Sequence, residues 1–409
     1  MRSQDKPQEQ GFTLVEIMVA IAVTSVIVLA GMSALTMTGK AVRANEQISG
    51  AQQNARMAME MIAQDIKMAG FGPPIDPSKN PPPVGSCGIG GIPVPILPGD
   101  NNPTVGVPDT GPDQISLVVP LTFYGGPAAV PPSWQTTAAL GVGAGGFAAV
   151  PINAAILPNM VAAGLTANSY ISLGGIVEAR VGGAAAPLVL TVPDPGPTQV
   201  PAGTQIFILQ CITYQVIPQL AGGAPGADLN NICAGNAPCL VRGIANATVA
   251  SFGRVLPNCN VPNSPCLPIV DGIEDLQLAY ACDGCLLPAA GLSEPDGRID
   301  DVSLNLIFDQ PDYISNQIWN TSPMTPSAIK MVQVSIVARQ QSVDNGLGDA
   351  NTQAGAGTLS TTFLTVDDHA HANGVFVAGD AGAQIPPYAS VRRRVVTRTV
   401  ETRNARPWS

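Results

Sequence analysis

The sequence predicts an α+β fold in which one long N-terminal helix packs on a mainly antiparallel β-sheet head with long, disulfide-stapled loops. Residues 17–39 carry no charge, and the residues up to 69 keep a helical spacing of apolar side chains. Beyond them, short runs of apolar and β-branched residues recur between turns. The helix is therefore expected to be first transmembrane and then amphipathic.

The first half of the helix contains an acid in an otherwise apolar setting. The run IMVAIAVTSVIVLAGMSALTMTG is long enough to cross a bilayer, and Lys40 closes it. Glu16 stands immediately before the run. An acidic side chain in hydrocarbon costs roughly 2.5 to 3.5 kcal/mol and marks a candidate functional site with a cationic partner.

The segment before the run, MRSQDKPQEQG, lacks the order of a secretory signal, because its small residue Gly11 precedes the apolar segment. Cleavage after Gly11 would expose the amine of Phe12, four residues from Glu16 in one helix. Two unit charges about 4 Å apart attract by about 4 kcal/mol at an effective dielectric near 20. The same pairing between two chains would also set the axial register of a subunit.

The string GFTLVE before an apolar helix resembles the class III leader and methylation motif of type IV pilins and type II secretion pseudopilins. The resemblance implies that a prepilin peptidase cuts after Gly11 and methylates Phe12, and that Glu16 is the assembly carboxylate. Residues 1–11 would then be the leader and 12–39 the transmembrane and assembly half of the helix. The alternative is an ordinary signal-anchor helix. The leader departs from the usual pattern, because two acids offset its two basic residues and weaken the positive-inside signal.

The second half of the helix, residues 40–70, is expected to be amphipathic. Its apolar positions lie three or four residues apart: Ile48, Ala51, Ala55, Met59, Ile62, Ile66 and Ala69. Gly70 and the prolines that follow end the pattern. One helix from Phe12 to Ala69 would be about 87 Å long. Because glycine weakens a helix interior, curvature or local melting is expected at Gly31, Gly39 and Gly50.

Residues 71–409 are expected to form one β-rich head with insertions. Six segments are interpreted as strands: DQISLVVPLTFY, SYISLGGIVEARV, APLVLTV, TQIFILQCITYQVI, DVSLNLIFD and IKMVQVSIVARQ. In the last of these, Val332, Val334, Ile336 and Ala338 alternate as one buried face. Residues 72–112, 125–165 and 218–240 are rich in proline, glycine and alanine and are interpreted as surface loops.

Several segments of the head narrow the resemblance to PilW-type minor pilins: residues 65–72, 201–216, 270–280, 329–340 and 388–404, in that order. The resemblance implies partners among other minor pilins, the major pilin, the inner-membrane assembly machinery and a tip adhesin. Two features depart from the family, an inserted proline-rich segment at 73–112 and Thr402 where an aliphatic residue is expected.

Eight cysteines follow the apolar run, an even number that suits an oxidising compartment: Cys87, Cys211, Cys233, Cys239, Cys259, Cys266, Cys282 and Cys285. Eight cysteines allow 105 pairings, so spacing does not fix the connectivity. The favoured interpretation pairs the sequence neighbours 233–239, 259–266 and 282–285, and leaves 87 with 211. The last neighbour pair has C-x-x-C spacing, so a redox pair or half a zinc site remain alternatives.

Other candidate chemistry is sparse, and neither a cofactor nor a metal is expected. The segment DDHAH at 367–371 holds both histidines and is interpreted as a solvated turn, with a metal site as the alternative. Glu294, Asp296, Asp300 and Asp301 cluster oxygen ligands as calcium-binding loops do, but the segment does not match the EF-hand pattern, so a calcium site is only the alternative interpretation. The arginines between 392 and 406 are interpreted as a solvated edge strand, with DNA or lipid contact as the alternative. No nucleophile-elbow or zinc-protease motif occurs, so catalysis is not predicted.

These features favour a non-enzymatic subunit that sits in the bacterial inner membrane with its head in the periplasm and later joins a pilus. As a PilW-type minor pilin it would act in a priming and tip complex, and so in twitching motility and adhesion. One alternative is a pseudopilin of a type II secretion system. Another is a pilus-borne binding module for DNA or a surface ligand.

Overall fold

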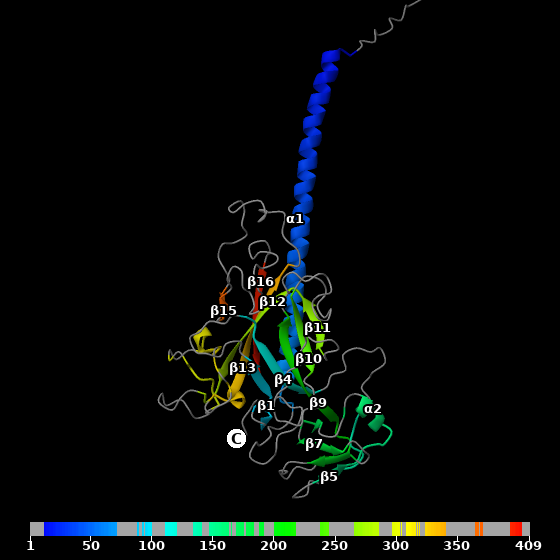
Figure 1. Ribbon diagram of the computed structural model, residues 1–409, viewed down its shortest axis with the longest axis vertical. Helices are drawn as coiled ribbons and strands as arrows, with labels where there is room; N and C mark the ends of the chain where they lie inside the picture. The colour runs from blue at the N-terminus through cyan, green and yellow to red at the C-terminus, as the bar shows by residue number, and fades with distance from the viewer. Residues whose placement is uncertain are drawn as a thin grey trace, which may run out of the picture.

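The computed structural model shows one long helix that projects from a β-rich head (Figure 1). It describes residues 12–71, 88–89, 92–93, 95–99, 111–120, 134–140, 147–162, 165, 169–175, 177–183, 188–191, 200–217, 238–244, 266–285, 297–302, 304, 308–315, 317, 319, 324–340, 365–367, 369–370 and 393–402.

Helix α1 (Leu14–Met68) has 55 residues and is about 82 Å long at 1.5 Å per residue. It begins two residues later than expected, because Thr13 has extended backbone angles and serves as the N-cap. The local melting expected at the three glycines is absent, and the helix is continuous through them. Ala69 leaves the helical conformation, and Gly70 donates its N–H to the carbonyl of Val118.

The head contains two main antiparallel sheets. The smaller has the order β12-β13-β16, formed by Ile273–Cys282, Ile329–Arg339 and Arg393–Glu401. The larger has the order β11-β10-β9-β6-β7-β8-β5, formed by Cys266–Asp271, Cys239–Ile244, Ile206–Ile217, Tyr170–Leu173, Val177–Gly183, Leu188–Thr191 and Phe147–Val150. Strands β4 (Gln114–Pro120) and β3 (Ile96–Gly99) extend it, since β4 pairs with β9.

The remaining elements are short. Two-residue strands form the pairs β1 with β2 (Gly88–Ile89, Ile92–Pro93) and β14 with β15 (Thr365–Val366, His369–Ala370). Helix α2 spans Leu157–Ala162, and the 3₁₀ turns η2 and η3 span Gln310–Asp312 and Pro326–Ala328.

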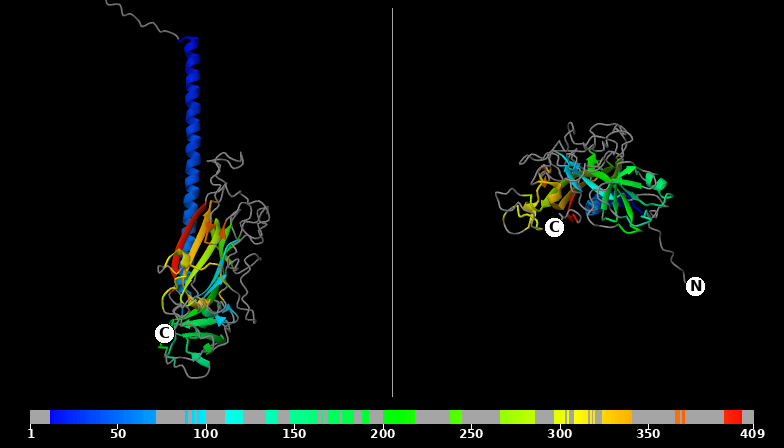
Figure 2. Two further views of the ribbon diagram at one scale, coloured as in Figure 1. Left: turned by 90° about the vertical axis from the view of Figure 1, so that its left-hand side faces the viewer. Right: turned by 90° about the horizontal axis from the view of Figure 1, so that it is seen from below.

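The first hydrophobic core holds the second half of α1 against both sheets. The apolar stripe of the helix, from Ala51 to Ala69, is buried there as expected. Strand β13 lies between its neighbours and is buried on both faces, rather than on one face only, from Val332 to Ala338. In Figure 2 the three-stranded sheet runs along α1, which agrees with the contacts that α1 makes with β13 and β16.

The second hydrophobic core lies at the end of the head farthest from the start of α1 (Figure 1). It gathers side chains from β5, β6, β7 and α2, and the first half of β9 contributes Ile206 and Ile208. The second half of β9 reaches the first core, so one strand joins the two. Phe71 adds a second link, because its ring contacts that of Phe207 edge-on at 4.9 Å.

Four of the six expected strand segments are strands as a whole or in their central part, and two differ. The segment SYISLGGIVEARV is a hairpin of β6 and β7, because Gly174 and Gly175 both adopt positive φ and turn the chain. In the segment DVSLNLIFD the described residues belong to no strand, and Leu304 itself has a φ of 58°. Positive φ is incompatible with extended backbone, which explains the difference.

The segments that were expected to be surface loops contain short strands and a helix, which their amino-acid composition did not indicate. Strands β1 to β3 lie within 72–112, and β5 and α2 lie within 125–165. Ile96 and Leu97 of β3 are buried. Alanine, glycine and proline carry little periodic signal, so pairing with neighbouring strands, which is a tertiary property, determines these elements.

Candidate functional site

The acid at the start of α1 caps its own helix. The Glu16 carboxylate accepts hydrogen bonds from the backbone N–H and the hydroxyl of Thr13, both at 2.9 Å, and the Thr13 hydroxyl accepts from the Glu16 N–H at 3.3 Å. This reciprocal capping box satisfies donors at the helix terminus. Phe12 precedes the cap instead of lying in the same helix as expected, and it is exposed. Gly11 lies outside the described residues.

The described part of the head does not cover the apolar half of α1. All described side chains from Phe12 to Glu46 are exposed, and Gln47 is the first that is partly buried. A shallow groove runs along one side of this bare segment, lined by Phe12, Glu16, Ile17, Ala20, Ile21, Thr24, Ser25, Val28 and Leu29. By length and composition α1 is able to cross a membrane. An exposed apolar rod of this size requires lipid or other helices around it.

The comparisons with known proteins bear on this N-terminal segment. The family model of the prokaryotic N-terminal methylation motif matches residues 6–32. A "Pilin-like protein PilA3" from Thermus thermophilus is 36% identical over 62 residues, 15% of this chain. The match covers 27% of that relative. No solved structure matches.

The chain combines a prepilin-type methylation motif at the start of an exposed apolar helix with an antiparallel head on the other half of that helix. The chain is a type IV pilin-like protein. Pilin-like proteins are structural rather than catalytic.

A buried polar cluster, which sequence reasoning missed, joins the second half of α1 to the larger sheet. Asp65 accepts a hydrogen bond from the hydroxyl of Tyr214 at 2.5 Å and pairs with Nε of Arg242 at 3.0 Å. All three residues are buried. Burial first, and then the neighbouring Asp65 carboxylate, raises the pKa of Tyr214, so the phenol keeps its proton and donates. The signal that could have found the cluster was an acid placed on the apolar stripe, three residues after Ile62.

The described cysteines are all in disulfides. Cys282 and Cys285 are bonded to each other, as the spacing suggested. Cys211, Cys239 and Cys266 are also disulfide-bonded. Their partners, and with them Cys87, Cys233 and Cys259, lie outside the described residues, so the other three expected pairings stay predictions.

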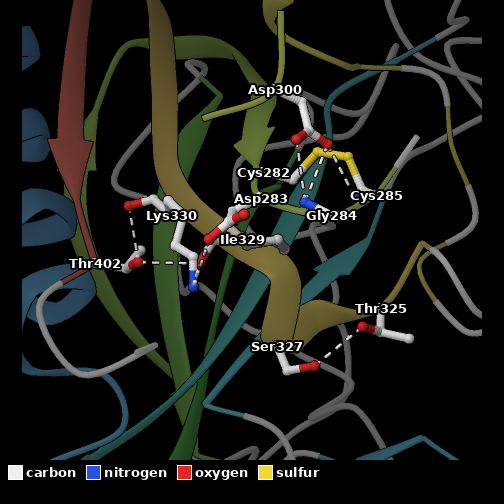
Figure 3. A network of polar contacts seen from close by, with 10 residues as sticks. All are labelled: Cys282, Asp283, Gly284, Cys285, Asp300, Thr325, Ser327, Ile329, Lys330 and Thr402. Carbon is white, nitrogen blue, oxygen red and sulfur yellow. Dashed lines mark hydrogen bonds and ion pairs between the residues drawn. A yellow bond between two sulfur atoms is a disulfide. The ribbon is translucent and has the colours of Figure 1, made fainter. Parts of the chain in front are cut away.

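The loop that the Cys282–Cys285 bond closes is held by a carboxylate (Figure 3). Asp300 accepts hydrogen bonds from the backbone N–H groups of Gly284 at 3.1 Å and Cys285 at 2.9 Å. The two sulfurs and this carboxylate lie close enough together to hold a metal ion. In the disulfide, however, the sulfurs are not thiolates and cannot serve as metal ligands. The geometry therefore favours a structural staple, and Asp300 completes it.

The same network of polar contacts holds the C-terminal end of β16 (Figure 3). Asp283, in the stapled loop, lies 3.9 Å from Nζ of Lys330 at the start of β13. The hydroxyl of Thr402 donates toward the carbonyls of Ile329 and Lys330. A threonine at 402, where the family resemblance called for an aliphatic residue, is thus explained by these hydrogen bonds.

The other acidic candidates are only partly described. Glu294 and Asp296 lie outside the described residues, as do Asp368, His371 and the side chain of His369. Asp367 is described, with a φ of 50°. Burial raises its pKa, and a hydrogen bond with Ser335 opposes the shift.

Two arginines of the basic C-terminal strand β16 are paired with acids. Arg393 makes two hydrogen bonds to Glu274, at 2.6 and 2.9 Å, and Arg398 reaches Glu60 of α1 at 2.7 Å. In the part of the chain that is described, β16 is an edge strand as expected, with one partner, β13, but Arg393 is not solvated, because its side chain is only 4% exposed beside Glu274. These two arginines hold the strand to the sheet and to the helix, which leaves them less available for a polyanion. Arg392, Arg403 and Arg406 lie outside the described residues.

Proposed function

We propose that this chain is a minor pilin of the PilW type, which takes part in type IV pilus assembly within a priming and tip complex. Its partners would be the prepilin peptidase, other minor pilins, the major pilin, the inner-membrane assembly machinery and a tip adhesin. Twitching motility and adhesion would depend on it. The observation that carries the proposal is the bare, apolar α1 that begins at a methylation motif and ends in a firmly attached head.

In the proposed mechanism, the apolar half of α1 moves from lipid to contacts with neighbouring helices. In the inner membrane, with the head in the periplasm, the groove on α1 faces lipid; in the pilus it faces a neighbouring helix. The Glu16 carboxylate already lies at the N-terminal end of the helix, where it accepts a hydrogen bond from the backbone N–H of Thr13. The new amine of Phe12, from the same chain or a neighbour, would then pair with it.

Two variants test this proposal. Gly11→Ser is expected to block processing, which a mobility shift on a gel and the mass of the N-terminus report. Glu16→Ala is expected to leave the protein processed and in the membrane, and to reduce surface pili and twitching. Thr13→Ala is the matched control, since it removes a capping hydroxyl and keeps the carboxylate. Normal piliation with Glu16→Ala would refute the role, and a defect in protein secretion instead of twitching would indicate a secretion pseudopilin.

A further inference from the structure

Two basic residues separate the apolar part of α1 from the head. Lys40 ends the charge-free run, and Arg43 follows three residues later, which places both cations on one side of the helix. We call these two residues the basic pair. Both are exposed, and within the described residues neither forms an ion pair. Among the described residues, the first partly buried side chain, that of Gln47, comes after the basic pair, so the described part of the head leaves the pair uncovered.

The basic pair lies at a defined depth when the apolar run spans a bilayer. Residues 17–39 cover about 35 Å at 1.5 Å per residue, slightly more than the roughly 30 Å of hydrocarbon. The headgroup layers bring the total to about 40 to 45 Å, so each adds about 5 to 8 Å. Residues 40–43 rise about 6 Å along the helix. The basic pair therefore coincides with one headgroup layer, and the head begins just beyond that layer.

The charge of the basic pair contrasts with the rest of the chain. The protein has a net charge of −10, yet Lys40 and Arg43 are the only charged residues between Glu16 and Glu46. On the other side of the apolar run, two acids offset the two cations of residues 1–11. Lysine and arginine beside a spanning helix are attracted to anionic lipids, and their long stems let the charged ends reach the phosphates.

We propose that the basic pair binds the headgroups of anionic phospholipids at the membrane face nearer the head. This inference rests on the membrane placement of α1 in the proposed function. The contacts hold the chain at a fixed depth, with the head resting just outside the headgroups, until assembly removes the helix from the lipid. Extraction of the helix must therefore break these ionic contacts, in addition to moving the apolar surface of α1 out of the lipid.

The test is lipid selection by the full-length chain. The detergent-solubilised protein is mixed with equal amounts of phosphatidylglycerol and phosphatidylcholine that carry the same acyl chains, and native mass spectrometry measures which lipid stays bound. The wild-type chain is expected to retain phosphatidylglycerol. In the Lys40→Gln/Arg43→Gln variant, each lost cation is expected to lower that preference about fivefold, or about 25-fold together.

The matched control is Arg56→Gln/Lys67→Gln, which removes two exposed cations from the head-covered half of the same helix. This control is expected to keep the preference of the wild type. Equal retention of both lipids by the wild type would overturn the proposal, and so would an equal loss in the control. The assay contains no other pilin, so normal pili in the Glu16→Ala strain would refute the proposed function and leave this result standing.

Discussion

The buried Asp65 cluster provides the sharpest test of how the helix is attached to the head. Asp65→Ala removes the carboxylate that pairs with Arg242 and accepts from Tyr214, at sites that are nearly closed to water. Removing one partner of a buried ion pair costs about 3 to 5 kcal/mol, because the other charge stays buried without it. The phenol loses its acceptor as well, so the upper part of this range is expected.

Urea unfolding followed by tryptophan fluorescence measures the effect. With a slope of about 1 to 3 kcal/mol per molar urea, the midpoint should fall by at least about 1 M. Trp319 lies in the first core and Trp134 in the second. In a Trp408→Phe background, replacing either of these two by phenylalanine leaves one tryptophan and therefore shows which core has weakened.

Two controls separate the ion pair from the packing around it. Tyr214→Phe deletes one hydrogen bond to a charged group and should cost only about 1.5 to 3 kcal/mol. The triple change Asp65→Leu/Tyr214→Phe/Arg242→Met replaces the whole cluster by apolar groups and should be close to neutral. A midpoint shift below about 0.3 M for Asp65→Ala would refute the reasoning, since it would mean that water or another group compensates the charge.

Three further predictions follow from the head. Gly175→Ala should destabilise the protein by about 1 to 2 kcal/mol, because φ is +72° there, whereas Gly183→Ala, in open space, should stay within about 0.5 kcal/mol in the same urea assay. Since burial raises the pKa of Asp367 above its ordinary 3.8, the folded state binds this proton more tightly than the unfolded state. Stability should therefore fall as pH rises from about 4 through the raised pKa; urea midpoints across pH should show a flatter slope for Asp367→Asn, and an unchanged slope would contradict the shift. The Cys282–Cys285 bond, whose cysteines are almost fully buried, should resist a dithiol reductant until the head unfolds, and rapid thiol labelling of native protein would show that the site is accessible instead.

Local patterns predicted the long helix well. The charge-free run, the spacing from Ile48 to Ala69 and the motif around Glu16 are all short-range features, and one helix needs only short-range hydrogen bonds. Strands with β-branched residues, such as β9 and β13, were found for the same reason. The capping role of Thr13 was missed, although its spacing from Glu16 is the signature of a capping box.

Sequence alone established an apolar helix with an acid at its start, an amphipathic continuation, and a β-rich, cysteine-containing head. Only the tertiary structure decided that Asp65 meets Arg242 across 177 positions, that Asp300 caps the stapled loop, and that the head has two cores joined by β9. The physical reason is the separation along the sequence of the residues that interact. Helical period and capping depend on residues three or four apart, whereas strand partners and buried ion pairs depend on which distant segments the fold brings together.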